Sequence, residues 1–156
     1  MKQLLPVLFL LIFLTSCKQE SPAPLPPAAA PSVFEKTYID THNGYSEAVV
    51  ITTSTQKTIY ISGQIGEGED MEAQMRDALF KMEDVLRKSG AGMKDVIKMN
   101  TYIVDYGPES LEVFREVRKS LLGDSDMPAS TLVGVDALAL PEWLIEIEAV
   151  AVLPIP

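Results

Sequence analysis

The sequence predicts an α+β fold in which two helices pack against one sheet. Two segments place apolar residues at helical spacing, and six shorter segments have the apolar pattern of strands. Their order along the chain is three strands, a helix, a strand, a second helix and two strands. Because each helix has one apolar stripe to bury, two helices against one sheet form a layered α+β domain.

Three strands are expected before the first helix, at residues 33–39, 47–53 and 58–64. In the third of them polar and apolar residues alternate, so Ile59 and Ile61 share one face of the strand. Glycines follow directly and end this strand.

The first helix is expected to begin after Asp70, a residue type that caps helix N-termini. Gly90 stands where a C-terminal cap belongs. The apolar stripe consists of residues spaced three and four apart, namely Met71, Met75, Ala78, Leu79, Met82, Val85 and Leu86. Methionines at this spacing are expected to fill the core rather than to bind a ligand.

The second half of the domain repeats the pattern once more. A strand at residues 96–104 is followed by a helix that carries Pro108 in its first turn and ends at Gly123. The buried stripe of this helix is Leu111, Phe114, Val117 and Leu121. Two last strands are expected at residues 129–135 and 144–152.

The N-terminus has the layout of a secretory signal peptide. Lys2 precedes an apolar run over residues 4–14, and small residues follow the run. Cys17, the only cysteine, comes next and resembles the lipidated residue of a bacterial lipobox. The resemblance implies removal of residues 1–16, acylation of Cys17 and a membrane-anchored lipoprotein on the periplasmic or cell-envelope side. Plain secretion and an uncleaved membrane anchor are the alternatives, but a span needs about 20 apolar residues.

Residues 17–32 are expected to form a tether between the lipid and the domain. Pro and Ala dominate residues 18–31, which show no apolar periodicity and are typical of a semi-rigid spacer. The folded domain then covers residues 33–156, which is enough chain for one hydrophobic core.

Composition argues against several classes of function. The formal net charge of -9 disfavours a nucleic-acid partner, because phosphate binding depends on Lys and Arg. With His42 as the sole histidine and one cysteine, a zinc site of His and Cys is excluded. No organic cofactor or metal is expected, although a carboxylate-only site for magnesium or calcium is not excluded.

Four segments carry a resemblance to a known family. They are Tyr45-Ser46-Glu47-Ala48-Val49, Ile61-Ser62-Gly63-Gln64-Ile65, Met127-Pro128-Ala129-Ser130-Thr131 and Ile145-Glu146-Ile147-Glu148-Ala149-Val150-Ala151-Val152. In residue identity, order and spacing they resemble the motifs of the Rid (YjgF) family over essentially the whole domain. The resemblance implies a chorismate-mutase-like α+β fold with a mixed sheet, and a homotrimer with a small-molecule cleft at each subunit interface.

The resemblance also implies an activity and points to one departure from it. Well-studied members hydrolyse reactive enamines and imines, releasing ammonia and a 2-keto acid, and use an arginine in a Pro-Ala-Arg segment to bind the substrate carboxylate. Here Ser130 occupies that position. A hydroxyl donates one neutral hydrogen bond and cannot neutralise a carboxylate, so this departure argues against the classical 2-imino-acid deaminase activity.

The remaining cleft residues are carried over from the family pattern. Glu146 is expected to position or activate the attacking water, although a solvent-facing glutamate is the alternative. The other substrate-binding residues implied by the resemblance are Tyr45, Ser62 and Gly63, and Ser130 and Thr131 are expected to offer hydroxyl donors in the cleft. We also consider the hypothesis that Arg115, on the second helix, supplies the cation that Ser130 does not; a solvated surface arginine is the alternative.

Three functional classes remain open on the sequence alone. The cleft could hydrolyse an imine or a related C–N bond, it could bind a small metabolite without turnover, or the domain could be a tethered trimeric scaffold. A shared fold does not decide between them.

Overall fold

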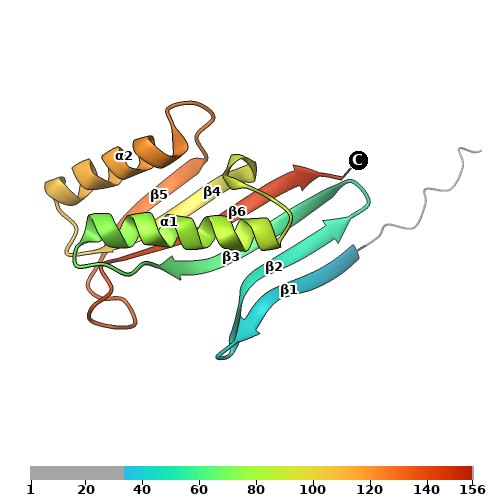
Figure 1. Cartoon of the computed structure of the whole chain (residues 1–156), viewed down its shortest axis with the longest axis horizontal. Coiled ribbons are helices and arrows are strands. Elements are labelled where there is room, and N and C mark those ends of the chain that lie inside the picture. Colours follow the sequence, from blue (N-terminus) through green and yellow to red (C-terminus); the bar gives the residue numbers. More distant parts are fainter. Residues whose placement is uncertain (1–33, 156) are drawn as a thin grey trace, which may run out of the picture. The chain divides into compact units, whose positions relative to one another are not determined.

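The computed structural model describes residues 34–155, which form one mixed six-stranded sheet with two helices. The sheet order is β1-β2-β3-β6-β4-β5, and both helices lie on the same face of it (Figure 1). The elements are β1 (Phe34–His42), β2 (Tyr45–Thr53), β3 (Gln56–Ile65), α1 (Met71–Lys88), the short 3-10 helix η1 (Met93–Asp95), β4 (Val96–Val104), α2 (Pro108–Leu122), β5 (Ala129–Val135) and β6 (Ile145–Pro154).

The sheet is antiparallel except at one edge. β4 and β5 run parallel, and α2 forms the crossover between them. Every other neighbouring pair is antiparallel, including β3 with β6 and β4 with β6. The predicted α+β fold with a mixed sheet is therefore confirmed, and α2 is placed over the edge strand β5.

Helix α1 begins and ends where the sequence predicts. The Asp70 carboxylate accepts a hydrogen bond from the Ala73 amide at 2.8 Å, which satisfies one unpaired donor of the first turn. Ser89 is the C-cap, and Gly90 follows it with φ of 80°, the left-handed conformation that glycine adopts easily. The face between these ends buries Met75, Met82 and Leu86 against the sheet.

The core lies between the two helices and one face of the sheet. Alternate residues of the central strands are fully buried there, among them Ile59, Ile145 and Ile147. Phe114 and Val117 bring the inner face of α2 to the same core. The predicted stripes pack as expected except at the end of α2, where Leu121 is exposed and its neighbour Leu122 packs against the core instead.

Two local features were not predicted. β1 runs on to His42 because Asn43 and Gly44 form a tight hairpin turn, with φ of 48° and 88°. The turn η1 precedes β4. The predicted signal peptide, lipidated Cys17 and tether lie outside the described residues.

The second face of the sheet carries no helix among residues 34–155. It exposes Phe34, Tyr38, Tyr60 and Val133, which are register neighbours or alternate residues of their strands. Large apolar side chains on an uncovered sheet face favour contact with a partner. No helix in this described part is long and apolar enough to cross a membrane.

Candidate functional site

Glu146 lies on the helix-free face of the sheet, near the start of β6. Its neighbours Ile145 and Ile147 point into the core, so Glu146 and Glu148 both point the other way. Glu146 is opposite Ile65 on β3 and Tyr102 on β4. The two carboxylates thus share a face, as the alternation of β6 predicts.

Gly63 makes room for the Glu146 carboxylate. The register between β3 and β6 shifts between Ile61 and Gln64, and Gly63 lies in this irregularity. A Cβ atom built on Gly63 would stand 1.7 Å from Oε1 of Glu146. A side chain at position 63 would displace this carboxylate, so Gly63 and Glu146 form one structural unit.

The surroundings of Glu146 favour its protonated form. Burial raises the pKa of Glu146, and the nearby charge of Glu148 raises it further. Glu148 is itself held in place, because Asn100 Nδ2 donates to its Oε1 at 2.7 Å and the Tyr102 hydroxyl donates to the same oxygen at 3.2 Å. A carboxyl group with a raised pKa can exchange a proton closer to neutral pH.

Ser62 precedes Gly63 on β3, and Tyr45 is the first residue of β2. The Ser62 hydroxyl donates to the Ser46 carbonyl at 2.6 Å and so links the two strands. Tyr45 is 47% exposed, and its hydroxyl lies 3.4 Å from Oε1 of Glu47. Burial and the Glu47 charge raise the pKa of Tyr45, which keeps the phenol protonated as a hydrogen-bond donor.

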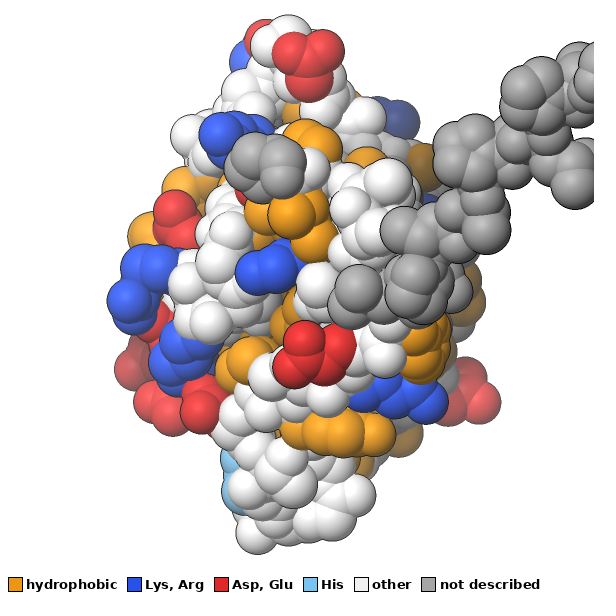
Figure 2. All heavy atoms as spheres, turned by 90° about the vertical axis from the view of Figure 1, so that its right-hand side faces the viewer, with side chains coloured by type: hydrophobic (Ala, Val, Ile, Leu, Met, Phe, Trp, Pro, Cys, Tyr) orange, Lys and Arg blue, Asp and Glu red, His pale blue; other side chains and the backbone are white. Residues whose placement is uncertain are grey.

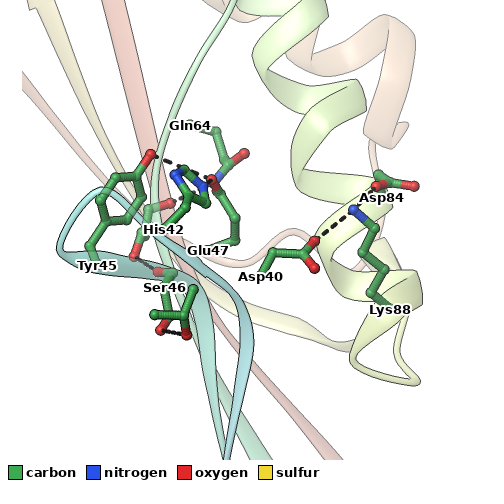
Figure 3. Close-up of polar contacts among 10 residues, drawn as sticks. Asp40, His42, Tyr45, Ser46, Glu47, Gln64, Asp84 and Lys88 are labelled. Atoms are coloured by element: carbon green, nitrogen blue, oxygen red, sulfur yellow. Dashed lines mark hydrogen bonds and ion pairs between the residues drawn. The ribbon is translucent and has the colours of Figure 1, made fainter.

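A polar cluster around Glu47 was missed in the sequence. Figure 3 shows His42, Tyr45 and Gln64 pointing toward the Glu47 carboxylate. His42 Nε2 lies 2.6 Å from Oε1, and Gln64 Nε2 donates to Oε2 at 2.9 Å. Burial alone would raise the pKa of Glu47, but the hydrogen bonds from Gln64 and His42 lower it. The spacing of His42 and Glu47 around the Asn-Gly turn was the available signal.

An open groove of about 580 Å³ separates this cluster from α1. Asp40 reaches across the groove and pairs with Lys88 at 2.8 Å, and Lys88 also pairs with Asp84 at 2.8 Å (Figure 3). Each of these three charged groups has an oppositely charged partner, so this side of the groove presents no unpaired charge from Asp40, Asp84 or Lys88.

Ser130 and Thr131 lie at the opposite edge of the sheet, on β5. Ser130 is in register with Met99, which is buried beneath the helices, so Ser130 faces α2. Thr131 faces the other way, and its hydroxyl accepts a hydrogen bond from Lys98 Nζ at 2.6 Å. The two hydroxyls therefore do not point into one pocket.

The helix arginine nearest Ser130 is Arg118 rather than Arg115. Arg115 is exposed, as the alternative reading of the sequence expected. Arg118 is partly buried, and it lines a narrow space between α2 and the sheet together with Ser130 and Phe114. The signal for Arg118 was its position four residues after Phe114 on the inner stripe of α2.

Within one chain the predicted residues form two groups that do not meet. Ser62, Gly63 and Glu146 lie on β3 and β6, whereas Tyr45 at the start of β2 contacts Glu47. Ser130 lies on β5, two strands away from β6, and it faces the helices whereas Glu146 faces away from them. Neighbouring strands are about 4.8 Å apart, so the two groups are about 10 Å apart laterally and separated by the sheet. A small ligand that contacts both groups needs a second copy of the chain.

Residues 34–155 contain no group of three or more His, Asp and Glu side chains that could bind a metal ion. On the side of the domain seen in Figure 2, basic and acidic side chains are mixed rather than gathered into one basic patch.

Comparison with known proteins gives one consistent result. The profile of the family described as Endoribonuclease L-PSP matches residues 35–153. A 2-iminobutanoate/2-iminopropanoate deaminase of Dermatophagoides farinae is 33% identical over 117 residues, covering 70% of this chain and 85% of that protein.

Solved structures agree with the sequence matches. A member of the YjgF/YER057c/UK114 family from Mycobacterium tuberculosis has a TM-score of 0.66 and 32% identity, covering 75% of this chain and 98% of that chain. A protein of the conserved Rid family from Yersinia pestis has a TM-score of 0.58 and 34% identity, covering 76% of this chain and 98% of that chain. The chain therefore belongs to the Rid (YjgF) family, whose profile is described as Endoribonuclease L-PSP.

Proposed function

We propose that this protein hydrolyses a small imine or enamine metabolite in a cleft formed between two copies of the chain. The observation that carries the proposal is the Glu146 carboxylate, which lies over Gly63 in a partly buried position with a raised pKa. The relative from Dermatophagoides farinae is named for the same class of reaction.

The chemistry needs one group that moves protons. Glu146 accepts a proton from water as the water oxygen adds to the imine carbon, and it returns this proton to the imine nitrogen. In the resulting carbinolamine Glu146 transfers the hydroxyl proton to the amine nitrogen, so that the C–N bond breaks, ammonia leaves and a C=O group remains. A carboxyl group with a raised pKa suits both proton transfers, because it accepts and returns a proton closer to neutral pH than an ordinary carboxyl group does.

A homotrimer is the assembly that we propose, as the family resemblance implies. The separation of Glu146 from Ser130 within one chain supports a cleft between copies. The helix-free sheet face supports it further, because this face exposes Tyr38, Tyr60 and Val133.

The test is ammonia release from freshly generated 2-iminopropionate. Glu146→Gln should reduce turnover at least 100-fold, since general acid–base catalysis contributes about 10²–10⁴-fold. The matched control is Glu142→Gln, which changes an exposed carboxylate four residues earlier and should leave turnover unchanged. Equal rates in the wild type and Glu146→Gln would contradict the assigned role of Glu146.

Ligand binding without turnover is the second candidate function. It is favoured by Ser130, which stands where the family resemblance expects an arginine that orients the substrate carboxylate. In this case a 2-oxo acid would raise the melting temperature by mass action, yet no ammonia would form from the imine.

We further propose that the protein is anchored to a membrane through lipidated Cys17, on the periplasmic or cell-envelope side. Stable anchoring takes more than one acyl chain, which an acylated N-terminal cysteine would carry. Labelled palmitate should be incorporated into the wild type but not into Cys17→Ala, and this variant should leave the membrane fraction. Equal labelling of both proteins would contradict the anchor.

A further inference from the structure

Arg118 differs from the other arginines of the described domain. Arg76 and Arg87 each pair with a carboxylate on α1, and Arg115 is exposed to water. Arg118 is partly buried, and no carboxylate among residues 34–155 forms an ion pair with it. It is therefore a cation that lacks both full hydration and a counter-charge.

The surroundings of the Arg118 guanidinium satisfy only part of its charge and hydrogen-bonding capacity. Nη2 donates to the Pro128 carbonyl at 3.2 Å, and Cζ lies 5.6 Å from the centre of the Phe114 ring. Nε is buried and has no hydrogen-bond partner. Burial lowers the pKa of Arg118, although an arginine stays charged in a protein. A buried charge without an ionic partner is unfavourable, which indicates that an anion is missing.

Space for an anion exists on the outer side of this residue. A hollow of about 280 Å³ is lined by Arg115, Arg118, Lys119 and Asp124, with Phe114 and Met127 as its apolar wall. Lys119 pairs with Asp124 at 3.3 Å, which leaves the two arginines without an acid. The inner space next to Ser130 holds only about 10 Å³, too little for anything larger than a single water molecule.

We propose that this hollow binds a small organic monocarboxylate, with the Arg118 guanidinium as its principal partner. Helix α2 would thus provide the cation that β5 does not provide at Ser130. The planar guanidinium fits a carboxylate with two parallel hydrogen bonds. The acidic Asp124 at the rim disfavours a doubly charged ligand such as a phosphate ester. The inference rests on the proposed function only for the kind of carboxylate, a 2-imino or 2-oxo acid.

Binding of pyruvate is the first test, and it needs no turnover. The full chain, Arg118→Met and the control Arg87→Met, which changes an exposed arginine on α1 outside the hollow, would be titrated by calorimetry. Wild type and Arg87→Met should bind with similar Kd, whereas Arg118→Met should bind at least about 10-fold more weakly, as expected for loss of a charged hydrogen-bonding pair. An unchanged Kd in Arg118→Met, or no binding of pyruvate by the wild type, would overturn the proposal.

Thermal stability separates a binding role from a structural one. Without ligand, Arg118→Met should melt at a higher temperature than the wild type, because it replaces an unpaired buried cation with an apolar side chain that still packs on Phe114. Pyruvate should raise the melting temperature of the wild type but not of this variant. A lower melting temperature in Arg118→Met without ligand would assign Arg118 a structural role and contradict the proposal.

The oligomeric mass in solution and ligand binding by other variants distinguish a ligand site at Arg118 from other roles of this residue. If the missing anion were a carboxylate of a second copy, Arg118→Met would reduce the oligomeric mass in solution, and the proposal would fail. Glu146→Gln should lose ammonia release while pyruvate still raises its melting temperature, so loss of the proposed hydrolysis and loss of anion binding are distinguishable. Arg118→Lys, which keeps the charge without the planar fork, should bind with intermediate Kd.

Discussion

Most charged side chains on the outer face of α1 have oppositely charged partners, whereas Glu146 and Arg118, which lie in different parts of the domain, have none among residues 34–155. On α1, acids and bases pair within one turn, as Glu72 does with Arg76 and Asp77 with Lys81, both at 2.9 Å. Glu146 instead lies beside a second carboxylate, and Arg118 forms an ion pair with no carboxylate of the described residues.

The pKa shifts express the same contrast. Burial raises the pKa of Glu146 and lowers the pKa of Arg118, so the environment disfavours the charged form of each. On α1, hydrogen bonds from the Glu67 amide and Lys81 lower the pKa of Asp77 and favour its charged form. Uncompensated charge in a folded chain is costly, and it therefore marks groups whose partner is a ligand.

The largest effect on activity, after loss of Glu146 itself, is expected from Gly63→Ala. The new Cβ would occupy the position of the Glu146 carboxylate, which must then swing away. A displacement of about 1 Å can reduce turnover about 100-fold. The measurement is ammonia release from 2-iminopropionate. Since the atoms displaced belong to a flexible side chain, circular dichroism should show an intact fold.

A double variant sharpens this prediction. In a Glu146→Gln background, Gly63→Ala should cause little additional loss of activity, because both changes disable one unit. Two fully additive losses would show that Gly63 acts independently of Glu146.

Gln74→Ala should lower the stability of the fold without acting directly on the catalytic step. Gln74 is buried; it donates to the Gly68 and Glu142 carbonyls and accepts from the Leu144 amide, so it ties α1 to the chain entering β6. Leaving these buried groups unpaired should lower the free energy of unfolding by about 1–3 kcal/mol. Urea denaturation measures this change.

The matched control is Glu72→Ala, also on α1. It removes an exposed pair with Arg76 and should lower the free energy of unfolding by only about 0.3–0.5 kcal/mol. If both variants lower the free energy of unfolding by the same amount, the exposed ion pair between Glu72 and Arg76 stabilises the fold as much as the buried amide of Gln74 does. This result would contradict the difference between paired surface charges and buried polar groups.

The smallest effect is expected from Glu148→Gln, as a change in pH dependence. The raised pKa of Glu146 means that the folded state retains a proton that the unfolded chain releases near its usual pKa of about 4.3. Stability should therefore fall as pH rises from that value through the raised folded pKa. Glu148→Gln removes the neighbouring charge, so this decline should become smaller and the NMR titration of the Glu146 carboxyl should move to lower pH. A titration that stays in place would assign the shift to burial alone.

Local signals were sufficient for most of the fold. The bounds of β4 and β5 and the cap at Asp70 follow from alternation, proline and glycine positions and a capping carboxylate, all of which act within a few residues. The Asn43-Gly44 hairpin was also readable, but the apolar pattern ended earlier and the turn signal was overlooked.

The site was less predictable because it depends on contacts between distant segments. That Glu146 and Glu148 share a face follows from strand alternation alone. The position of the Glu146 carboxylate over Gly63, in contrast, depends on the register of β3 against β6. The position of Arg118 beside Ser130 depends on how α2 packs over β5, so sequence reasoning selected the exposed Arg115 instead.

Mixing of two inactive variants tests most directly whether the cleft is built from two copies. Glu146→Gln and Arg118→Met would be unfolded, combined in equal amounts and refolded together. If each cleft takes Glu146 from one copy and Arg118 from another, random mixing leaves about a quarter of all clefts intact, so about a quarter of the wild-type ammonia release should return. Activity that stays at the level of the separate variants, although mixed assemblies have formed, would contradict a shared cleft.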